Sequence, residues 1–452
     1  MGVHIQKSIG QIPDLWQKNV IFFGNLLSLF YGNAEETKVL RQEVGALETY
    51  GSRLIPIINL MYQAEDNLLV LDKEPESQLI TYFSQSLQLK LPQIATLAHN
   101  DYLAITSEEQ EHSEEMTQFL HKLHAHSAQT IDGYIVDDVL MRIAEITGKS
   151  TTSSSMASRK ANNKLLLHEL LKEKQLPVFD TYVAHKQQEV QGSLMRLKSK
   201  GYSFAVVKSQ IGASGIGILK IPTYEITSTV PEYMFFEGPC MLQGWLDDLV
   251  DGVKMVGSPS VQLFLLDDKI IIHDLTEQIL SKESVHEGNV SPPPYILTEC
   301  ELKDELIHQA EIVSQWLHEL GFRGPASCDF HVTERKGKAE VRLCEVNARV
   351  TGATYPSLIA HHFAEGGVWL LRNIRFDPAV ESEKVLGILD EKKLLFHAGK
   401  PAGILPFNFN TNVAGNVVKG QFLFLGSSIN EVKNLLNEMI GIKELNGGYD
   451  RD

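Results

Sequence analysis

The sequence has few cysteines and a shortage of positive charge. Its four cysteines, Cys240, Cys300, Cys328 and Cys344, show no C-x-x-C spacing, so they do not form the pattern of a metal or redox motif. We expect reduced core cysteines in a cytoplasmic protein. The chain has 41 Lys and Arg against 57 Asp and Glu, a formal net charge of −16. Because nucleic-acid binding requires clustered basic residues, we expect no nucleic-acid partner.

Long apolar runs are also missing. The one candidate membrane segment, residues 19–31, is interrupted by Gly24-Asn25, and a membrane-spanning helix needs about 20 apolar residues. We therefore expect a buried strand there and no membrane partner. With 452 residues, of which 43% are hydrophobic, the chain can bury large cores, and its length predicts about three domains.

Short apolar runs alternate with helical patterns in the first part of the chain, which predicts an open α/β domain. The polar segment 149–158 has no periodicity and predicts a linker at the end of this domain. Two turns, Gly24-Asn25 and His99-Asn100-Asp101, follow predicted strands and are interpreted as ordinary turns rather than ligand contacts. Strands are expected at 20–23, 54–59, 68–71 and 94–98, and helices near 34–50, 76–88 and 114–124.

The most informative stretch is a predicted pair of strands, 326–333 and 341–350, joined by the turn-like E-R-K-G-K. Since strand side chains alternate between faces, Glu345, Asn347 and Arg349 should share one face, opposite Asp329 of the other strand. Carboxylate and amide oxygens beside an arginine are what Mg²⁺ and a polyphosphate require. The alternative is a solvated polar face. The other face is expected to carry Cys344, Val346, Ala348 and Val350.

A glycine-rich segment, 204–221, gives a second signal. It predicts a strand ending at Lys208, a loop from Gly212 to Gly217, and a second strand with Lys220. Glycines allow backbone N–H groups to approach phosphate oxygens, and a lysine supplies charge to them. No G-K-[ST] and no helix follow the loop, which excludes a Walker A motif and a Rossmann turn. In protein kinases the glycine loop comes before the strand lysine, the reverse of the order here.

The motif D…E-x-N-x-R-x-T-G, together with the order of strand lysine and glycine loop, resembles the ATP-grasp superfamily of carboxylate–amine ligases. The overall layout is similar to that of the pheganomycin-type peptide ligases within that superfamily. The motif residues are Asp329, Glu345, Asn347, Arg349, Thr351 and Gly352.

The resemblance implies an α/β fold, with an ATP-grasp core whose two lobes hold the nucleotide between them. It implies an N-terminal α/β domain at 1–157, an N-lobe at 158–240, a C-lobe with the metal site at 241–378, and a small C-terminal α/β unit at 379–452. The pattern of apolar residues predicts a strand at 386–389 in that last unit. It also predicts a helix in the C-lobe, from Pro356 to about Leu371.

The resemblance also implies the roles of individual residues. Asp329, Glu345 and Asn347 would bind two Mg²⁺ ions, for which Mn²⁺ can substitute. Arg349, Lys208 and His286 would act in catalysis. The expected ATP-binding residues are Lys164 (or alternatively Lys160), Lys208, Gly212, Ser214, Gly215, Gly217, Gln243, Gly244, Leu246 and Asp251, with Asp248 as the alternative to Asp251 for the ribose.

A lid is expected at 281–294, because the length of this polar segment, its glycine and its prolines suit a loop that orders over substrate. A plain surface loop is the alternative.

In the resembling enzymes, ATP phosphorylates a carboxylate and an amine attacks the acyl phosphate to give an amide. The expected partners are therefore a small carboxylate and an amine, either an amino acid or a peptide, and a homodimer is compatible with the resemblance. A phosphotransferase of the same fold, or a nucleotide-binding regulatory protein, is the alternative function. The sequence does not identify the acid or the amine.

Overall fold

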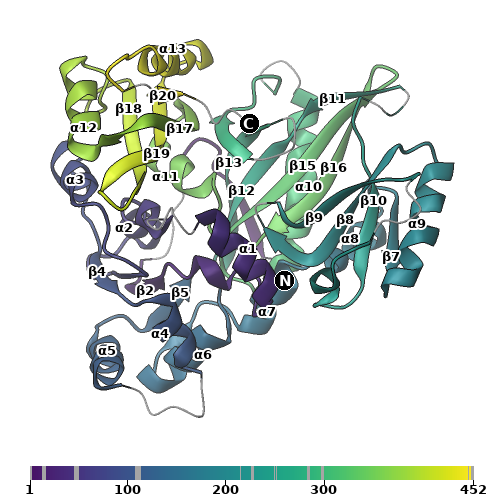
Figure 1. Ribbon diagram of the computed structural model, residues 1–452, viewed down its shortest axis with the longest axis horizontal. Helices are drawn as coiled ribbons and strands as arrows, with labels where there is room; N and C mark the ends of the chain where they lie inside the picture. The colour runs from purple at the N-terminus through teal and green to yellow at the C-terminus, as the bar shows by residue number, and fades with distance from the viewer. Residues whose placement is uncertain are drawn as a thin grey trace.

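The computed structural model describes residues 3–12, 17–44, 50–106, 113–213, 215–224, 229–248, 250, 252–281, 286–296, 300–445 and 447–448. Within these residues the strands form three sheets, flanked by helices (Figure 1). None of the helices in this described part of the chain has the length and apolar character that a membrane crossing requires.

The first sheet belongs to the N-terminal part of the chain and is parallel throughout, in the order β4-β3-β2-β5-β6. Its three inner strands β3, β2 and β5 are buried at every position, as expected for parallel strands covered on both faces. The predicted ranges of β2 and β3 are confirmed. The bounds are β2 (Val20–Phe23), β3 (Leu68–Leu71), β4 (Gln93–Thr96), β5 (Thr130–Gly133), β6 (Ser150–Thr151), α1 (Ala34–Val44), α4 (His99–Ala104), α5 (Glu114–Ala125) and α6 (Asp138–Thr147).

Two predictions in this part of the chain are wrong. The segment 54–59 is not a strand: it contains the end of a 3₁₀ helix and the start of α2 (Ile58–Tyr62). The expected linker at 149–158 contains the edge strand β6 and the beginning of α7 (Ser155–Ala161), where the Ser154 side chain caps the helix by accepting from the Ala157 N–H. The small polar residues of this segment therefore form an edge strand and a helix cap, and not a linker.

The second sheet is antiparallel, in the order β7-β10-β8-β9. The glycine-rich segment forms the β8–β9 hairpin, as predicted, but β8 continues past the predicted end at Lys208 to Ala213, and β9 begins at Ile216, inside the predicted loop. Helix α8 begins after Asn163, whose side chain caps it by accepting from the N–H groups of Leu165 and Leu166 at 3.0 Å each. The bounds are β7 (Thr181–Ala184), β8 (Phe204–Ala213), β9 (Ile216–Pro222), β10 (Cys240–Gly244), α8 (Lys164–Glu173) and α9 (Gln187–Ser199).

The third sheet has 11 strands within the described residues, with the main order β11-β15-β12-β13-β14-β17-β19-β18. Strand β16 lies beside β15, β1 beside β13, and β20 beside β17. The bounds are β1 (His4–Lys7), β11 (Val253–Gly257), β12 (Pro259–Leu265), β13 (Lys269–Leu280), β14 (His286–Ser291), β15 (Gly324–Arg335), β16 (Lys338–Asn347), β17 (Val368–Glu381), β18 (Gly403–Thr411), β19 (Asn416–Gly426) and β20 (Gly447–Gly448).

The third sheet continues past residue 378, because β17 crosses that position and pairs with β14 on one side and β19 on the other. The elements after residue 378 therefore extend the sheet that carries the predicted metal site. The division into domains at 157, 240 and 378 stays a prediction. Four helices accompany this sheet: α10 (Cys300–Glu319), α11 (Thr354–Phe363), α12 (Ser382–Glu391) and α13 (Ile429–Ile440).

Two element predictions fail in this region. The segment 386–389 lies in helix α12, which buries Val385 and Leu389 one turn apart. The helix after Pro356 ends at Phe363, and β17 begins at Val368. In both cases a short apolar run was compatible with either a helix or a strand.

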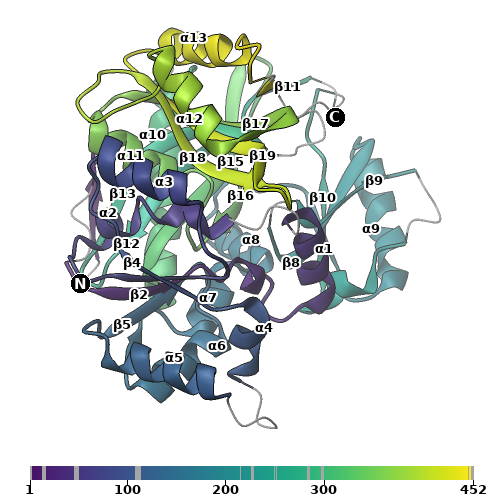
Figure 2. The ribbon, with the colours of Figure 1, turned by 60° about the vertical axis from the view of Figure 1, so that its left-hand side comes forward.

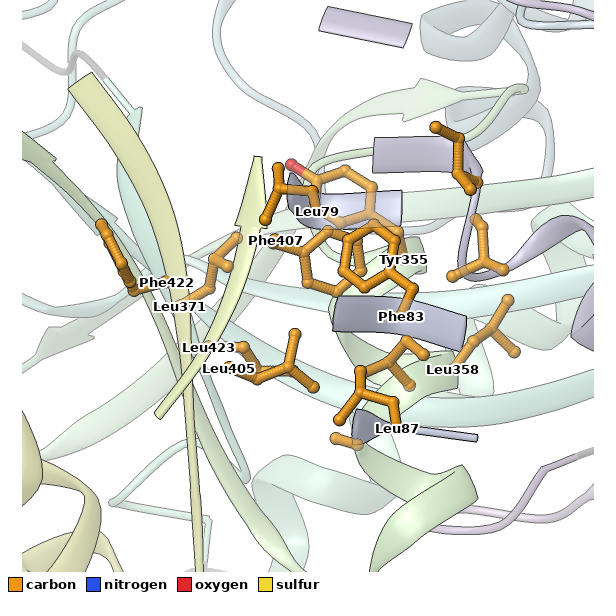
Figure 3. Close-up of a cluster of buried hydrophobic side chains, with 14 of the residues drawn as sticks. Leu79, Phe83, Leu87, Tyr355, Leu358, Leu371, Leu405, Phe407, Phe422 and Leu423 are labelled. Carbon is orange, nitrogen blue, oxygen red and sulfur yellow. The ribbon is translucent and has the colours of Figure 1, made fainter. Parts of the chain in front are cut away.

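The largest hydrophobic cluster joins the N-terminal domain to the third sheet (Figure 3). Leu79, Phe83 and Leu87, which follow the first sheet's strand β3, pack against side chains from α11 and from strands β17, β18 and β19. The partners labelled in the figure are Tyr355, Leu358, Leu371, Leu405, Phe407, Phe422 and Leu423. The N-terminal domain is thus held against the strands beyond the predicted metal site.

Candidate active site

The predicted strand pair is confirmed. β15 and β16 are antiparallel, with Asp329 directly opposite Glu345 and Ser327 opposite Asn347. The Asn347 Nδ2 donates to Asp329 Oδ2 at 2.8 Å, and the Ser260 hydroxyl of β12 donates to Asp329 Oδ1 at 2.6 Å. The polar face of this strand pair is therefore a connected set of oxygen and amide groups. Its apolar back is buried in the core of the third sheet.

The prediction for Cys344 is wrong, because a register shift at Asp329 and Phe330 inserts an extra residue into β16. Val341 and Leu343 face the core before this bulge, and Val346 and Ala348 face it afterwards. Cys344 therefore leaves the apolar face and lines the space between the lobes with Lys208. The switch of apolar positions from odd to even numbers was the sequence signal of the bulge.

The two facing carboxylates have different surroundings. Burial, and then the charge of Glu345, raise the pKa of Asp329 to about 6. Burial also acts to raise the pKa of Glu345, but the charges of Lys164, Lys208 and Arg349 outweigh it and keep that pKa below its usual value. Lys164 Nζ lies 3.2 Å from Glu345 Oε2. The hydrogen bonds around Asp329 therefore do not balance the negative charge of the two carboxylates, Asp329 and Glu345.

The residues fit a magnesium site of the open kind. No group of three or more His, Cys, Asp or Glu in the described residues could hold a metal, so Asp329, Glu345 and the amide of Asn347 would supply only part of a coordination shell. Mg²⁺ commonly binds through one or two carboxylates, with water and phosphate oxygens as its other ligands. The Arg349 Nη2 donates to Asn347 Oδ1 at 2.5 Å, which places the guanidinium beside the same polar face.

The glycine hairpin and the two lysines meet above this face. Lys164 Nζ donates to the Gly212 carbonyl at 3.1 Å while it pairs with Glu345, so one lysine joins the hairpin to β16. Gly215 and Gly217 have φ angles of +83° and +76°, which favour glycine. Burial lowers the pKa of Lys208, against the raising effect of Cys344 and Glu345. Ser214, predicted to bind ATP, lies outside the described residues.

The space expected for the adenine is nearly closed. A cavity of about 10 Å³ lies between the lobes, whereas small-molecule pockets usually have about 300–1,000 Å³. The side chains that line this cavity would have to move for a nucleotide to bind there. The lining includes Lys164, Phe179, Lys208, Met241, Gln243 and Cys344.

Of the residues predicted at the adenine and ribose end, Gln243 lines this cavity, and the others that the structure describes have partners elsewhere. The Gln243 Nε2 donates to Thr181 Oγ1 at 3.1 Å, the Gly244 N–H donates to the Asp180 carbonyl at 2.9 Å, and the Leu246 carbonyl is 3.0 Å from His331 Nε2. Asp248 accepts the Met255 N–H at 2.7 Å. Asp251 lies outside the described residues.

The lid predicted at 281–294 is wrong where the structure describes it. His286–Ser291 is strand β14, hydrogen-bonded between β13 and β17 inside the third sheet. The polar sequence of this segment did not predict a strand, because the buried positions of β14 include Gly288, Asn289 and Ser291. Residues 282–285 lie outside the described chain.

His286, predicted to act in catalysis, lies beside the Thr351-Gly352 turn of the motif. A Cβ on Gly352 would lie 3.3 Å from its Cε1, and its Nε2 is 2.7 Å from Asn289 Oδ1. Desolvation lowers the pKa of His286, with smaller lowering effects from Arg53 and Arg372, and the hydrogen bond with Asn289 opposes this shift.

A chain of hydrogen bonds beneath the site was not predicted from the sequence. Gln262 donates to Ser260 at 2.8 Å, and the Thr351 hydroxyl donates to Gln262 Oε1 at 3.2 Å. Through Ser260 this chain connects Thr351 to Asp329. The available signal was the alternation of Ser260 and Gln262 with apolar residues in a strand that is buried throughout.

No family model matches the chain. A curated relative, the [butirosin acyl-carrier protein]–L-glutamate ligase of Niallia circulans, is 24% identical over 201 residues. The matched region covers 44% of this chain and 45% of that protein, so the chain spans less than half the length of this relative.

Solved structures match over nearly the whole chain. The N5-carboxyaminoimidazole synthase of Aspergillus clavatus, solved with ADP and 5-aminoimidazole ribonucleotide, has a TM-score of 0.53 and 14% identity, covering 95% of this chain and 99% of that chain. A biotin carboxylase–ATP complex from Campylobacter jejuni has a TM-score of 0.55 and 11% identity, covering 94% and 91%. The predicted resemblance to the ATP-grasp superfamily and the predicted α/β class are thereby confirmed at the level of the fold, which the chain shares with these enzymes, and its sequence is related to that of a ligase. The finer resemblance to the pheganomycin-type peptide ligases stays a prediction.

Proposed function

We propose that this chain is an ATP-dependent ligase that joins a carboxylate to an amine through an acyl phosphate. The observation that carries the proposal is the facing pair Asp329 and Glu345, with Lys164 at 3.2 Å and the Arg349 guanidinium on the same face. Two acids and several cations at the junction of two lobes suit a polyphosphate and its metal ions. The likeness to the glutamate ligase supports amide formation over simple phosphorylation.

The residues would divide the work by position. Asp329, Glu345 and Asn347 would hold two Mg²⁺, or Mn²⁺ in their place, and the ions would neutralise charge on the polyphosphate. Lys208 and Lys164 would contact the phosphates from the hairpin side. Arg349 would contact the transferring γ-phosphoryl group, because its planar fork stays charged and matches phosphate oxygens.

The reaction would proceed in two displacements. A carboxylate oxygen of the acid attacks the γ-phosphorus, the bond to the bridging oxygen breaks, and ADP leaves. The amine nitrogen then attacks the acyl carbon, the C–O bond to phosphate breaks, and the amine loses a proton as inorganic phosphate departs. Water would hydrolyse the acyl phosphate, so exclusion of water from the closed interlobe space would protect it.

The acid and the amine are proposed only as a class. The relative's name suggests L-glutamate as one substrate to test and a carrier-bound acyl group as another. The described cysteines Cys240, Cys328 and Cys344 are free of disulfides, which supports the cytoplasmic location that we propose. The homodimer stays a prediction.

Hydroxylamine trapping tests the proposed chemistry. The chain would be incubated with ATP, Mg²⁺ and a panel of amino acids, short peptides and carrier-bound acids, with and without hydroxylamine. We expect a hydroxamate that requires ATP and one class of acid, and release of ADP and phosphate in equal amounts when the correct amine replaces hydroxylamine. A stable phosphorylated product, with neither hydroxamate nor free phosphate, would establish the phosphotransferase alternative.

A further inference from the structure

The tip of the β8–β9 hairpin packs against the N-terminal domain. Ala213 and Ile216 flank the turn of the hairpin and are 6% and 5% exposed. They belong to a hydrophobic cluster whose other buried members all come from the N-terminal domain. Helix α1 lies beside the hairpin strands in both ribbon views (Figures 1 and 2). The N-terminal members are Leu29, Phe30, Leu40 and Ile135.

A buried glutamate of α1 lies against the glycine backbone of the same hairpin. Glu36 is 1% exposed, and its Oε1 accepts the Ser209 hydroxyl at 3.0 Å. A Cβ on Gly217 would lie 2.7 Å from this oxygen, so only glycine leaves room for the carboxylate. The Ser209 Oγ also lies 2.6 Å from the Ile211 carbonyl and 3.2 Å from the Gly217 carbonyl, so Glu36 is one of three acceptors around its single hydroxyl hydrogen. The carboxylate thus contacts both strands of the hairpin.

Burying the Glu36 carboxylate costs free energy, and an apolar side chain at the same position would not have this cost. Burial raises the pKa of Glu36 to about 7, with Glu237 adding to the effect, while Ser209 and the charge of Lys164 oppose it. An apolar residue in its place would pack without that cost. The free-energy cost of burying Glu36 therefore favours a role in fixing the hairpin over a role in stabilising the fold.

Polar contacts nearby support the same arrangement. Asn33, just before α1, donates from Nδ2 to the Tyr233 carbonyl at 3.1 Å. Arg159 of α7 pairs with Glu237 at 2.7 Å. Both acceptors belong to the segment that connects the hairpin to β10, so the second sheet is attached to the preceding part of the chain at several points.

The hairpin position matters for the active site because of Lys164. This lysine contacts the Gly212 carbonyl at 3.1 Å and Glu345 at 3.2 Å. A change in the hairpin would therefore alter the lysine that reaches the carboxylate pair.

We propose that Glu36 is a positioning residue that holds the glycine-rich hairpin over the phosphate end of the site, so that the N-terminal domain, and not the two nucleotide-binding lobes alone, closes the site. This inference rests on the proposed function, because it takes the hairpin to be the phosphate-binding loop. Opening would break the Glu36–Ser209 contact and expose Ile216, and nucleotide binding would restore both.

Three substitutions test the inference. Glu36→Ala removes the carboxylate, Glu36→Gln keeps an oxygen that can accept the Ser209 hydroxyl, and Glu35→Gln changes the neighbouring exposed residue of the same helix turn as a control. The measurements are the affinity for ATP with Mg²⁺, by titration calorimetry, and amide hydrogen exchange over residues 204–222. Thermal unfolding of each variant reports whether it is folded.

We expect Glu36→Ala to weaken ATP binding about tenfold, the effect of losing about 1.4 kcal/mol, and to speed exchange in the hairpin. Glu36→Gln should recover most of the affinity, and Glu35→Gln should match the wild type. A merely structural role would lower the unfolding temperature without this rescue and without selective exchange in the hairpin.

Ile216→Ser tests the same contact from the hairpin side if Glu36→Ala does not fold. Unchanged ATP affinity and unchanged hairpin exchange in folded Glu36→Ala, or in Ile216→Ser, would overturn the inference. A wild-type chain that binds no ATP would instead overturn the proposed function, and hairpin exchange would still show whether Glu36 holds the hairpin.

Discussion

Two carboxylates of the third sheet, the buried Asp274 on β13 and the half-buried Asp329 on β15, lie on strands separated only by β12. Asp274 is surrounded by donors: it accepts hydrogen bonds from side chains of β14, α11 and β17, and from its neighbour's N–H. The donors are Ser291 at 2.7 Å, Ser357 at 2.6 Å, His361 at 3.0 Å, Trp369 at 3.2 Å and the Leu275 N–H at 2.8 Å.

Asp329 has fewer donors and a second carboxylate opposite it. Ser260, Ser327 and Asn347 donate to it, but it faces Glu345 across the strand pair. Burial would raise both pKa values. At Asp274 the donors, His361 first, outweigh burial and the pKa falls, whereas at Asp329 the pKa rises to about 6. Asp274, whose oxygens accept hydrogen bonds from several strands and a helix, therefore holds these elements together. Asp329 and Glu345, which face each other, are a pair that a cation would stabilise.

Glu345→Gln should have the largest effect on activity. It removes one negative charge from the pair and keeps its shape, so we expect ATP turnover to fall about 10³-fold, with the unfolding temperature close to that of the wild type. Phosphate release at saturating Mg²⁺ measures the effect. Near wild-type turnover under those conditions would remove Glu345 from the proposed metal site.

Asp274→Asn should have the largest effect on stability. It leaves buried donors without a charged acceptor, so we expect the free energy of unfolding to fall by about 3 kcal/mol. Urea denaturation measures it. Asp329→Asn is the matched variant, and we expect it to leave the free energy of unfolding nearly unchanged, because it removes repulsion along with its hydrogen bonds. Equal losses in both variants would contradict the distinction between the two carboxylates.

Lys208→Ala should have an intermediate effect, confined to nucleotide binding. Within the described residues Lys208 has no ion pair closer than 4.0 Å, and its ammonium lies 5.8 Å from the centroid of the Phe179 ring. We expect the affinity for ATP to fall about tenfold or more, as the loss of a charged hydrogen bond predicts. Lys198→Ala, at an exposed position of α9, is the control. The same affinity in both variants would show that Lys208 does not contact the phosphates.

The pH dependence should show the smallest effect. Because the pKa of Asp274 is lower in the folded chain than its usual value of 3.8, its stabilising contribution is complete above that value and is lost as pH falls through the folded pKa. Urea midpoints between about pH 6 and pH 3 should therefore fall less steeply for Asp274→Asn than for the wild type. If the urea midpoints of the wild type and of Asp274→Asn fell equally steeply with decreasing pH, the direction of this pKa shift would be contradicted.

Local sequence patterns predicted the parts of the site that lie within a single hairpin. Period-two alternation was enough to place Asp329 opposite Glu345, and glycine spacing was enough to place the β8–β9 turn. β14 was missed because three of its four buried residues are glycine, asparagine and serine, and because one of the strands that it pairs with, β17, is distant in the sequence.

Contacts between distant segments could not be predicted from such patterns. The pairing of β1 with β13 joins residues near 4–7 to residues near 269–272. The burial of Glu36 likewise depends on Ser209 and Gly217, far along the chain. In the sequence Glu36 cannot be distinguished from its exposed neighbour Glu35, because what differs between them is the tertiary contact.

Direct measurement of Mn²⁺ binding tests the central claim, that the Asp329–Glu345 pair is a cation site. Electron paramagnetic resonance of free Mn²⁺ would be recorded with the wild type, with Glu345→Gln, and with Glu340→Gln on the same strand as the control, each with ADP present. The account predicts that the wild type and Glu340→Gln bind Mn²⁺ with the same affinity and that Glu345→Gln loses most of it. Equal Mn²⁺ binding by all three chains, or none by the wild type, would contradict it.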